Sequence, residues 1–162
     1  MDVQKTTGRD ALLNILKTTA AHHLRAERAD QFIEFVANAM NFYPDASYLA
    51  RPATHIFHSL FGLFVFAEEG SGSQSPSSAR VKVFNPQPEV DGWLSAHTSI
   101  YMNQRDMPFL VDSLRMALNR RGLNIFTLQS NPVWVSRSAD GGLLHSNRVF
   151  FEGAHREAFI AI

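Results

Sequence analysis

The sequence contains no cysteine, which excludes disulfide bonds, thiolate metal sites and a cysteine nucleophile. This absence fits a reducing compartment, so the expected location is cytoplasmic. The longest apolar stretch, residues 56–67, is too short to cross a bilayer and contains His58 and Ser59. Residues 1–10 are polar and lack the apolar run of a signal peptide. We therefore expect no membrane association.

The sequence also has no net charge, because 15 lysines and arginines balance 15 aspartates and glutamates. Without a positive field to attract a polyanion, nucleic-acid binding is disfavoured. The adjacent Arg120 and Arg121 are interpreted as the solvated end of a helix, since no exposed aromatic residues alternate with them. A hydrophobic content of 45% in 162 residues is sufficient for a folded core.

Residues suited to catalysis are scarce. The lysines are Lys5, Lys17 and Lys82, and each is interpreted as a surface residue. The serines lack a Gly-x-Ser-x-Gly turn. His55 and His58 share one helix face, but they lack the glutamate and third ligand of a catalytic zinc site, so a packing or surface role is preferred. We expect no catalytic residue, no metal site and no bound cofactor in this chain.

The first 67 residues show apolar positions at helical spacing. Asp10 stands where an N-cap belongs, and Pro44 prevents continuation of the second helix. Pro52 suits the first turn of a third helix with a broad, phenylalanine-rich face. The helices are expected at residues 10–23, at 30–42 and from Pro52 to about residue 67, with one short turn at 46–50.

Residues 68–78 are rich in glycine and serine and contain no large apolar side chain. This composition predicts a flexible linker. We therefore divide the chain into an N-terminal helical segment (1–67), a flexible Gly/Ser linker (68–78) and a second domain (79–162).

Beyond the linker the apolar period changes to two, which is typical of strands. Asp106 is expected to cap a helix that runs to Arg121, with Pro108 in its first turn and Gly122 as its left-handed stop. Strands are expected at residues 80–84, 97–103, 123–128 and 133–135, with Asn131-Pro132 as an interruption, a turn at 138–142, a hairpin partner, and extended segments at 149–151 and 158–162. The predicted class is α+β.

Five ordered blocks resemble one known family. They are Val-Lys-Val-Phe-Asn-Pro (81–86), Asp-Gly-Trp (91–93), His-Thr (97–98), Asp-Met-Pro-Phe-Leu-Val-Asp-Ser (106–113) and Leu-Asn-Arg-Arg-Gly-Leu (118–123). In this order they resemble the opening region of the large bacterial NAD-specific glutamate dehydrogenases. The resemblance implies an ACT-like domain, a ferredoxin-like βαββαβ unit of the kind that commonly senses amino acids.

The resemblance also implies a parent enzyme that interconverts glutamate with 2-oxoglutarate and ammonia using NAD, with the chemistry in a distant catalytic domain. The expected partners are that domain, further copies of the chain in a homo-oligomer, and an amino-acid effector. The chain alone is expected to be inactive and to have a regulatory or assembly role. The alternative is a structural oligomerisation module that binds no small molecule.

In ACT domains the strand-to-helix loop contacts effectors, and here the matching stretch is residues 103–110. Free amide groups at a helix N-terminus suit a ligand carboxylate. The residues predicted to bind an effector are Asn103, Arg105, Asp106, Met107, Pro108, Phe109 and Leu110. The chain departs from the wider ACT pattern at Phe109, where a glycine usually follows the proline.

The predicted strands and helix are too few for a complete βαββαβ unit, which needs a second helix and a fourth strand. We therefore expect a partial ferredoxin-like antiparallel sheet with one main helix, and a fragment of a longer protein. One face of such a sheet needs cover from the N-terminal helices or from a partner, so self-association is expected.

Overall fold

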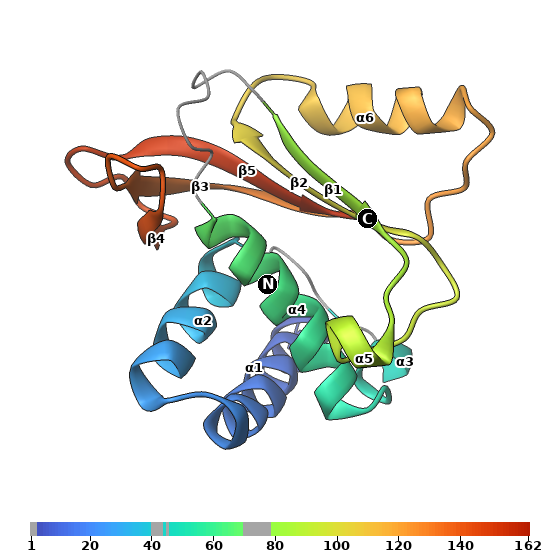
Figure 1. Cartoon of the computed structure of the whole chain (residues 1–162), viewed down its shortest axis with the longest axis vertical. Coiled ribbons are helices and arrows are strands. Elements are labelled where there is room, and N and C mark those ends of the chain that lie inside the picture. The colour runs from blue at the N-terminus through green and yellow to red at the C-terminus, as the bar shows by residue number, and fades with distance from the viewer. Residues whose placement is uncertain (1–2, 40–43, 45, 70–78) are drawn as a thin grey trace.

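A computed structural model of the chain describes residues 3–39, 44, 46–69 and 79–162. A layer of N-terminal helices covers one face of an antiparallel sheet, and a single helix, α6, lies over the other face (Figure 1). The helices are α1 (Val3–His23), α2 (Ala26–Ala39), α3 (Ala46–Leu49), α4 (Ala53–Glu68), α5 (Pro88–Asp91) and α6 (Leu110–Asn119). The strands are β1 (Arg80–Phe84), β2 (Ser99–Arg105), β3 (Gln129–Arg137), β4 (Leu143–Asn147) and β5 (His155–Ala161).

The first helix begins earlier than the sequence predicts. Asp10 lies inside α1 and caps nothing, so its prediction as the N-cap is wrong. The side chain of Arg9 donates a hydrogen bond to the carbonyl of Ala37 in α2. This bond holds the start of α1 against α2, although the sequence there shows no helical spacing of apolar residues. Helices are held largely by such tertiary contacts, and these are invisible to a pattern of apolar residues.

The other N-terminal helices lie near their predicted positions. α2 begins at Ala26, four residues before the expected start, and its expected end at residue 42 lies outside the described residues. The short turn is present as α3. Pro52 stands at the N-cap of α4, where its carbonyl accepts from the amides of His55 and Ile56 at 2.9 and 3.1 Å. A proline suits this place because its missing N–H would have no helical partner there.

The predicted linker lies outside the described residues from 70 to 78. Its first residue, Glu68, belongs to α4 and pairs with the Arg28 guanidinium. The Arg28 guanidinium also lies 4.8 Å from the ring centre of Phe64, so the charge pair rests on the aromatic core. None of the helices in the described part of the chain is long and apolar enough to span a membrane.

The sheet has five strands in the order β1-β2-β5-β3-β4, and each neighbouring pair is antiparallel. The last strand in the sequence, β5, therefore lies in the centre. β2 and β3, which α6 connects, are separated by it. Ile162 extends the pairing by exchanging two backbone hydrogen bonds of 2.9 Å with Ile100.

Two strand predictions in the second half are wrong. Residues 123–128 are mostly irregular, and β3 runs from Gln129 straight through Asn131 and Pro132. Pro132 is tolerated because β4 pairs with β3 only from Trp134 onward, so at Pro132 this side of β3 is still an open edge. β2 also begins at Ser99, two residues later than expected.

A third correction concerns residues 149–151, which lie in the loop between β4 and β5 and form no strand. The side chain of Asn147 accepts from the Val149 amide at 3.0 Å and turns the chain. The hairpin partner of β3 is β4, which follows the turn predicted around residues 138–142. Ser138 and Gly142 close this turn with a backbone hydrogen bond of 2.9 Å.

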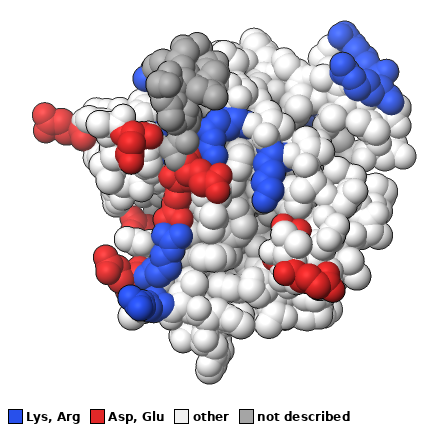
Figure 2. Space-filling view, viewed as in Figure 1, with Lys and Arg blue, Asp and Glu red and all other residues white. Residues whose placement is uncertain are grey.

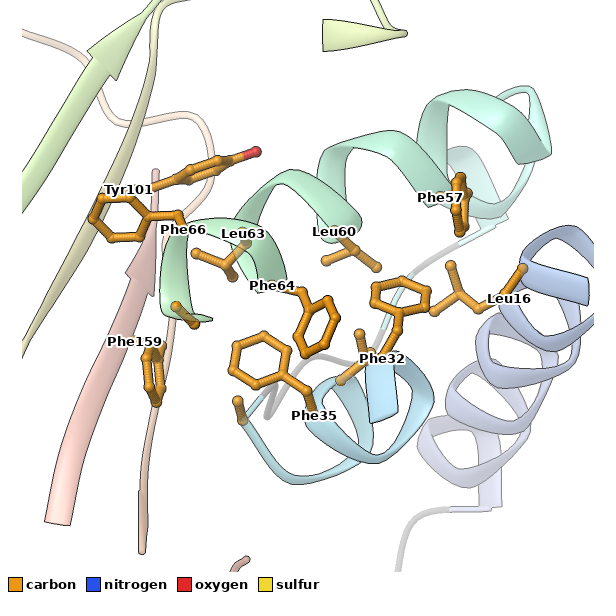
Figure 3. Packing of buried hydrophobic residues seen from close by; sticks show 14 of the residues in the cluster. Leu16, Phe32, Phe35, Phe57, Leu60, Leu63, Phe64, Phe66, Tyr101 and Phe159 are labelled. Carbon is orange, nitrogen blue, oxygen red and sulfur yellow. The ribbon is translucent and has the colours of Figure 1, made fainter. Parts of the chain in front are cut away.

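The helical layer and the sheet share one apolar core (Figure 3). Phe32 and Phe35 of α2 meet Phe64 of α4, with ring centres 5.8 and 5.4 Å apart. Phe159 of the central strand β5 meets Phe35 edge to face at 5.3 Å. Burying phenylalanine is worth roughly 1.5–3 kcal/mol for each side chain, so this cluster fixes the helices to the sheet.

The outer face of the sheet is covered less completely. Ala158 and Ile160 of the central strand β5 are buried, whereas Val81 and Val83 of the edge strand β1 are 56% and 61% exposed. α6 itself has no fully buried residue. The predicted α+β class with one main helix between strands is confirmed, and the N-terminal helices supply the second helical layer.

Candidate functional site

The loop between β2 and α6 is anchored to the neighbouring central strand. The Asp106 amide donates to the carbonyl of Arg156 at 3.1 Å, and the Asp106 carboxylate lies 3.5 Å from Nε of Arg156. Because Asp106 is held by β5 and lies outside α6, the prediction that it caps the helix is wrong. The loop therefore leaves the sheet at a fixed point.

Phe109 occupies the N-cap position of α6 in the left-handed conformation, with φ of 62°. Among the described residues, Phe109 is the only non-glycine residue with a positive φ. The ACT pattern usually places glycine here, and glycine adopts this conformation without steric cost. No side chain caps the first turn of α6, so its leading amide groups face the loop without a side-chain acceptor.

A cavity of about 410 Å³ opens beneath this loop, between the start of α6 and the outer face of the sheet. It is lined by Asp106, Met107, Phe109, Leu110, Val111, Asp112, Arg115, Leu128, Gln129, Ser130, Pro132 and Ala158. Two carboxylates and one guanidinium are therefore present in a lining that also has apolar side chains and the polar Gln129 and Ser130. Such a set can pair with both the ammonium and the carboxylate of a small zwitterion.

The structure divides the predicted effector residues. Asp106, Met107, Phe109 and Leu110 line the cavity, whereas Pro108 lies in the adjoining turn and is not part of the lining. Arg105 is exposed at the end of β2. Asn103 is buried and donates to Oε2 of Glu157 at 2.8 Å, away from the cavity.

Several lining residues were not predicted. Asp112 and Arg115 come from the first two turns of α6, and their spacing of three places them on one helix face. This spacing was available in the sequence as a signal. Pro132 and Ala158 come from β3 and β5, and only the register that pairs them brings them together.

A buried ion pair lies on the opposite face of the sheet. Arg137 donates to both carboxylate oxygens of Glu157 at 2.7 Å, and also to the carbonyls of Ala67 and Gly141 at 3.0 and 2.8 Å. Burial raises the pKa of Glu157, but the bonds and charge of Arg137, with Asn103 and His155, outweigh it and lower this pKa to about 2. These hydrogen bonds connect α4, β3 and β5. The side chains of Asn103, Arg137, His155 and Glu157 each have a hydrogen-bond partner within this group.

Two histidines of the helical layer, His23 and His58, pack against each other and against Phe57. The rings of His23 and His58 lie 5.6 Å apart, and His58 also meets Phe57 at 5.0 Å. Partial burial and the neighbouring His23 and His55 lower the pKa of His58, which favours its neutral form. Among the residues that the structure describes, no three histidine, aspartate or glutamate side chains are arranged to hold a metal ion.

Charged side chains are scattered on the face shown in Figure 2. Basic and acidic residues of the described chain alternate there among uncharged ones, and on this face no large area carries a single sign. This distribution agrees with the balanced charge of the sequence. It offers no broad electrostatic surface for a polyanion on this face.

Residues 35–162 match the family model described as glutamate dehydrogenase, ACT1 domain. The NAD-specific glutamate dehydrogenase of Pseudomonas aeruginosa is 56% identical over 63 residues, which make up 39% of this chain and 4% of that protein. The enzyme of the same name from Halomonas elongata is 45% identical over 62 residues, 38% of this chain and 4% of that protein. The matched region is thus a small part of both relatives. No solved structure matches the chain.

Proposed function

The chain belongs to the glutamate dehydrogenase ACT1 domain family, and from this premise we propose that it is a regulatory and assembly region of a cytoplasmic NAD-dependent glutamate dehydrogenase. In this proposal the parent enzyme converts glutamate to 2-oxoglutarate and ammonia. A catalytic domain outside this chain binds NAD and carries the reaction, and the present chain is inactive alone. The names of the two relatives support the enzyme class of the parent.

The cavity beneath the β2–α6 loop is the observation that supports a sensing role. We place the carboxylate of an amino-acid effector at Arg115 and the leading amides of α6. Its ammonium then lies toward Asp112 and Asp106. A volume of about 410 Å³ is within the range of ordinary small-molecule pockets.

The same geometry suggests how binding is transmitted. α6 rests on the sheet with no fully buried residue, so its position is weakly determined by packing. A ligand held between Arg115 of α6 and the strands would favour one position of the helix. A ligand shifts an equilibrium by no more than its differential affinity for the two states. The free energy transmitted to a distant catalytic domain therefore cannot exceed the preference of the effector for that position of α6.

Titration calorimetry of the 162-residue chain with glutamate and a panel of other amino acids tests this proposal. We expect heat of binding with at least one of them. Arg115→Gln removes a charged hydrogen bond and should weaken binding by about tenfold. The matched control is Arg120→Gln at the far end of the same helix, which should bind as the unchanged chain does.

The alternative function is an oligomerisation module without a small-molecule ligand. The observation that favours it is the exposure of Val81 and Val83 on the open edge strand β1. Sedimentation of the chain, compared with a Val83→Lys variant, tests for a homo-oligomer through this edge. A stable oligomer combined with no heat from any amino acid would favour this alternative over sensing.

A further inference from the structure

A second, larger cavity lies at the other end of α6. Its volume is about 540 Å³, and it is bounded by α3 and α4, by the loop that precedes β2, and by the chain that follows α6. The helical layer and the outer helix both contribute to it through Leu60 and Leu118. We propose that this cavity binds a small molecule that combines a planar apolar ring with one anionic group.

The walls of the second cavity are mainly apolar. Leu60 and Leu63 come from α4, Ile100 from β2, and Leu118 and Leu123 from the end of α6 and the turn after it. Leu123 remains 52% exposed, so this wall is not covered by the rest of the described chain. Such a wall favours a ligand with a large apolar part, because binding removes apolar surface of both the ligand and the cavity wall from water.

Aromatic side chains from three separate segments favour a planar ligand. Trp93, Tyr101 and Phe126 all line the cavity. At its rim the ring of His97 is stacked on Phe126, with centres 3.9 Å apart and planes 20° from parallel. Phe126 is nevertheless 69% exposed, so its side chain has surface left for contact with a ligand. Offset or edge contacts between rings add roughly 0.5–1.5 kcal/mol to the burial of their area.

The charge of the lining determines the polar part of the ligand. Among the described residues that line the cavity there is one arginine, Arg51, and there is no lysine, aspartate or glutamate. Its guanidinium lies 4.9 Å from the ring centre of Tyr48, another lining residue. A lone guanidinium attracts a carboxylate, sulfonate or phosphate, and no carboxylate side chain is present for an ammonium. This chemistry differs from the first cavity, where Asp106 and Asp112 accompany Arg115.

Indole-3-acetate is a suitable probe, because it carries a planar ring and a carboxylate but no ammonium. Indole alone and acetate alone are the matched probes. We expect calorimetry on the 162-residue chain to show binding of indole-3-acetate, binding of indole that is about tenfold weaker, and no binding of acetate. Amide shifts in two-dimensional NMR should map to residues 93–101 and 118–127, which line or adjoin the second cavity and not the first.

Two variants distinguish this cavity from others. Arg51→Gln should weaken indole-3-acetate about tenfold and leave indole unchanged, whereas Arg25→Gln, an exposed arginine outside the lining, should change neither. Leu123→Trp fills part of the space and should reduce binding of both ring probes, while circular dichroism checks that the fold is retained. A chain with Arg115→Gln should still bind the probe, because Arg115 lines the first cavity and not the second, although Gln129 lines both.

The proposal is overturned if neither ring probe produces heat or NMR shifts. It is also overturned if the shifts map to residues 106–115, or if Arg51→Gln and Leu123→Trp both bind like the unchanged chain. These outcomes are independent of amino-acid sensing, which is tested by different ligands and by Arg115.

Discussion

Arg137 and Glu157 form an ion pair of 2.7 Å between Nη2 and Oε2, and their side chains are only 12% and 7% exposed. Arg137 also donates to the carbonyl of Ala67 at the end of α4. One guanidinium therefore connects the helical layer to two strands of the sheet. Removing one partner leaves the other charged, buried and unpaired, so this pair is a sensitive point of the fold.

The lowered pKa of Glu157 predicts a loss of stability in acid. The carboxyl has a pKa of about 2 in the folded chain and an ordinary value of 4.5. Its contribution is therefore complete above pH 4.5 and decreases as pH falls toward 2, by about 3 kcal/mol in total. Urea unfolding of the chain at a series of pH values measures this loss.

Glu157→Gln is the control for the acid effect. At neutral pH it should lower the free energy of unfolding by about 3–5 kcal/mol, because Arg137 then lacks its counter-charge. Between pH 5 and pH 2 the variant should lose less stability than the unchanged chain. Parallel pH profiles for the two proteins would show that Glu157 is not the responsible group.

Gly92 and Gly122 provide a matched pair of substitutions. Both have a left-handed φ, 74° and 70°, but a Cβ at Gly92 would lie 2.6 Å from the His58 ring, whereas none of the described atoms lies within 4 Å at Gly122. Gly122→Ala should cost about 1 kcal/mol from backbone strain alone. Gly92→Ala should cost more, because His58 must also move. Equal midpoints in thermal unfolding would contradict the described contact.

Phe109→Gly should relieve the left-handed strain at the start of α6. Phe109 is 77% exposed, so little burial is lost. The comparison is Met107→Gly, which removes another exposed loop side chain at a residue without positive φ. We expect the Phe109 variant to be about 1 kcal/mol more stable than the Met107 variant in urea. A less stable Phe109 variant would mean that its ring contributes more than its exposure indicates.

Phe35 and Phe159 test whether the helices and the sheet unfold together. Their rings meet edge to face at 5.3 Å across the two layers. In a double-mutant cycle with leucine at each position we expect a coupling energy of about 0.5–1.5 kcal/mol. Helical circular dichroism and the fluorescence of Trp134, measured with Trp93 replaced by phenylalanine throughout, should report one shared transition in every variant. Two separated transitions would mean that the layers are independent.

The sequence predicted those elements whose signals are local. The alternation of Val81 and Val83 predicts β1, and Gly122 marks the stop after α6, where it has φ of 70°. The α+β class and the family resemblance rest on such local blocks, and both are confirmed.

The features that sequence reasoning missed depend on distant contacts. Asp106 is three residues before Phe109, and nothing local indicates that Arg156 of β5 holds it outside the helix. Asn131-Pro132 predicts an interruption of the strand, but the structure tolerates Pro132 because β4 does not extend beside β3 at this point. In the candidate site, the loop residues were predicted from the resemblance, but Ala158 joins them only through the pairing of β3 with β5.

The central place of β5 has a consequence for biosynthesis. β1 pairs with β2, and β3 pairs with β4, but in the described sheet the backbones of these two ribbons are joined through β5, whose residues are made last among the strands. Until residues 155–161 are available, the two ribbons cannot be joined, and the long separation in sequence between β2 and β5 slows their union. The sheet can therefore close only after those residues have emerged from the exit tunnel, and until then the ribbons present unpaired edges to chaperones.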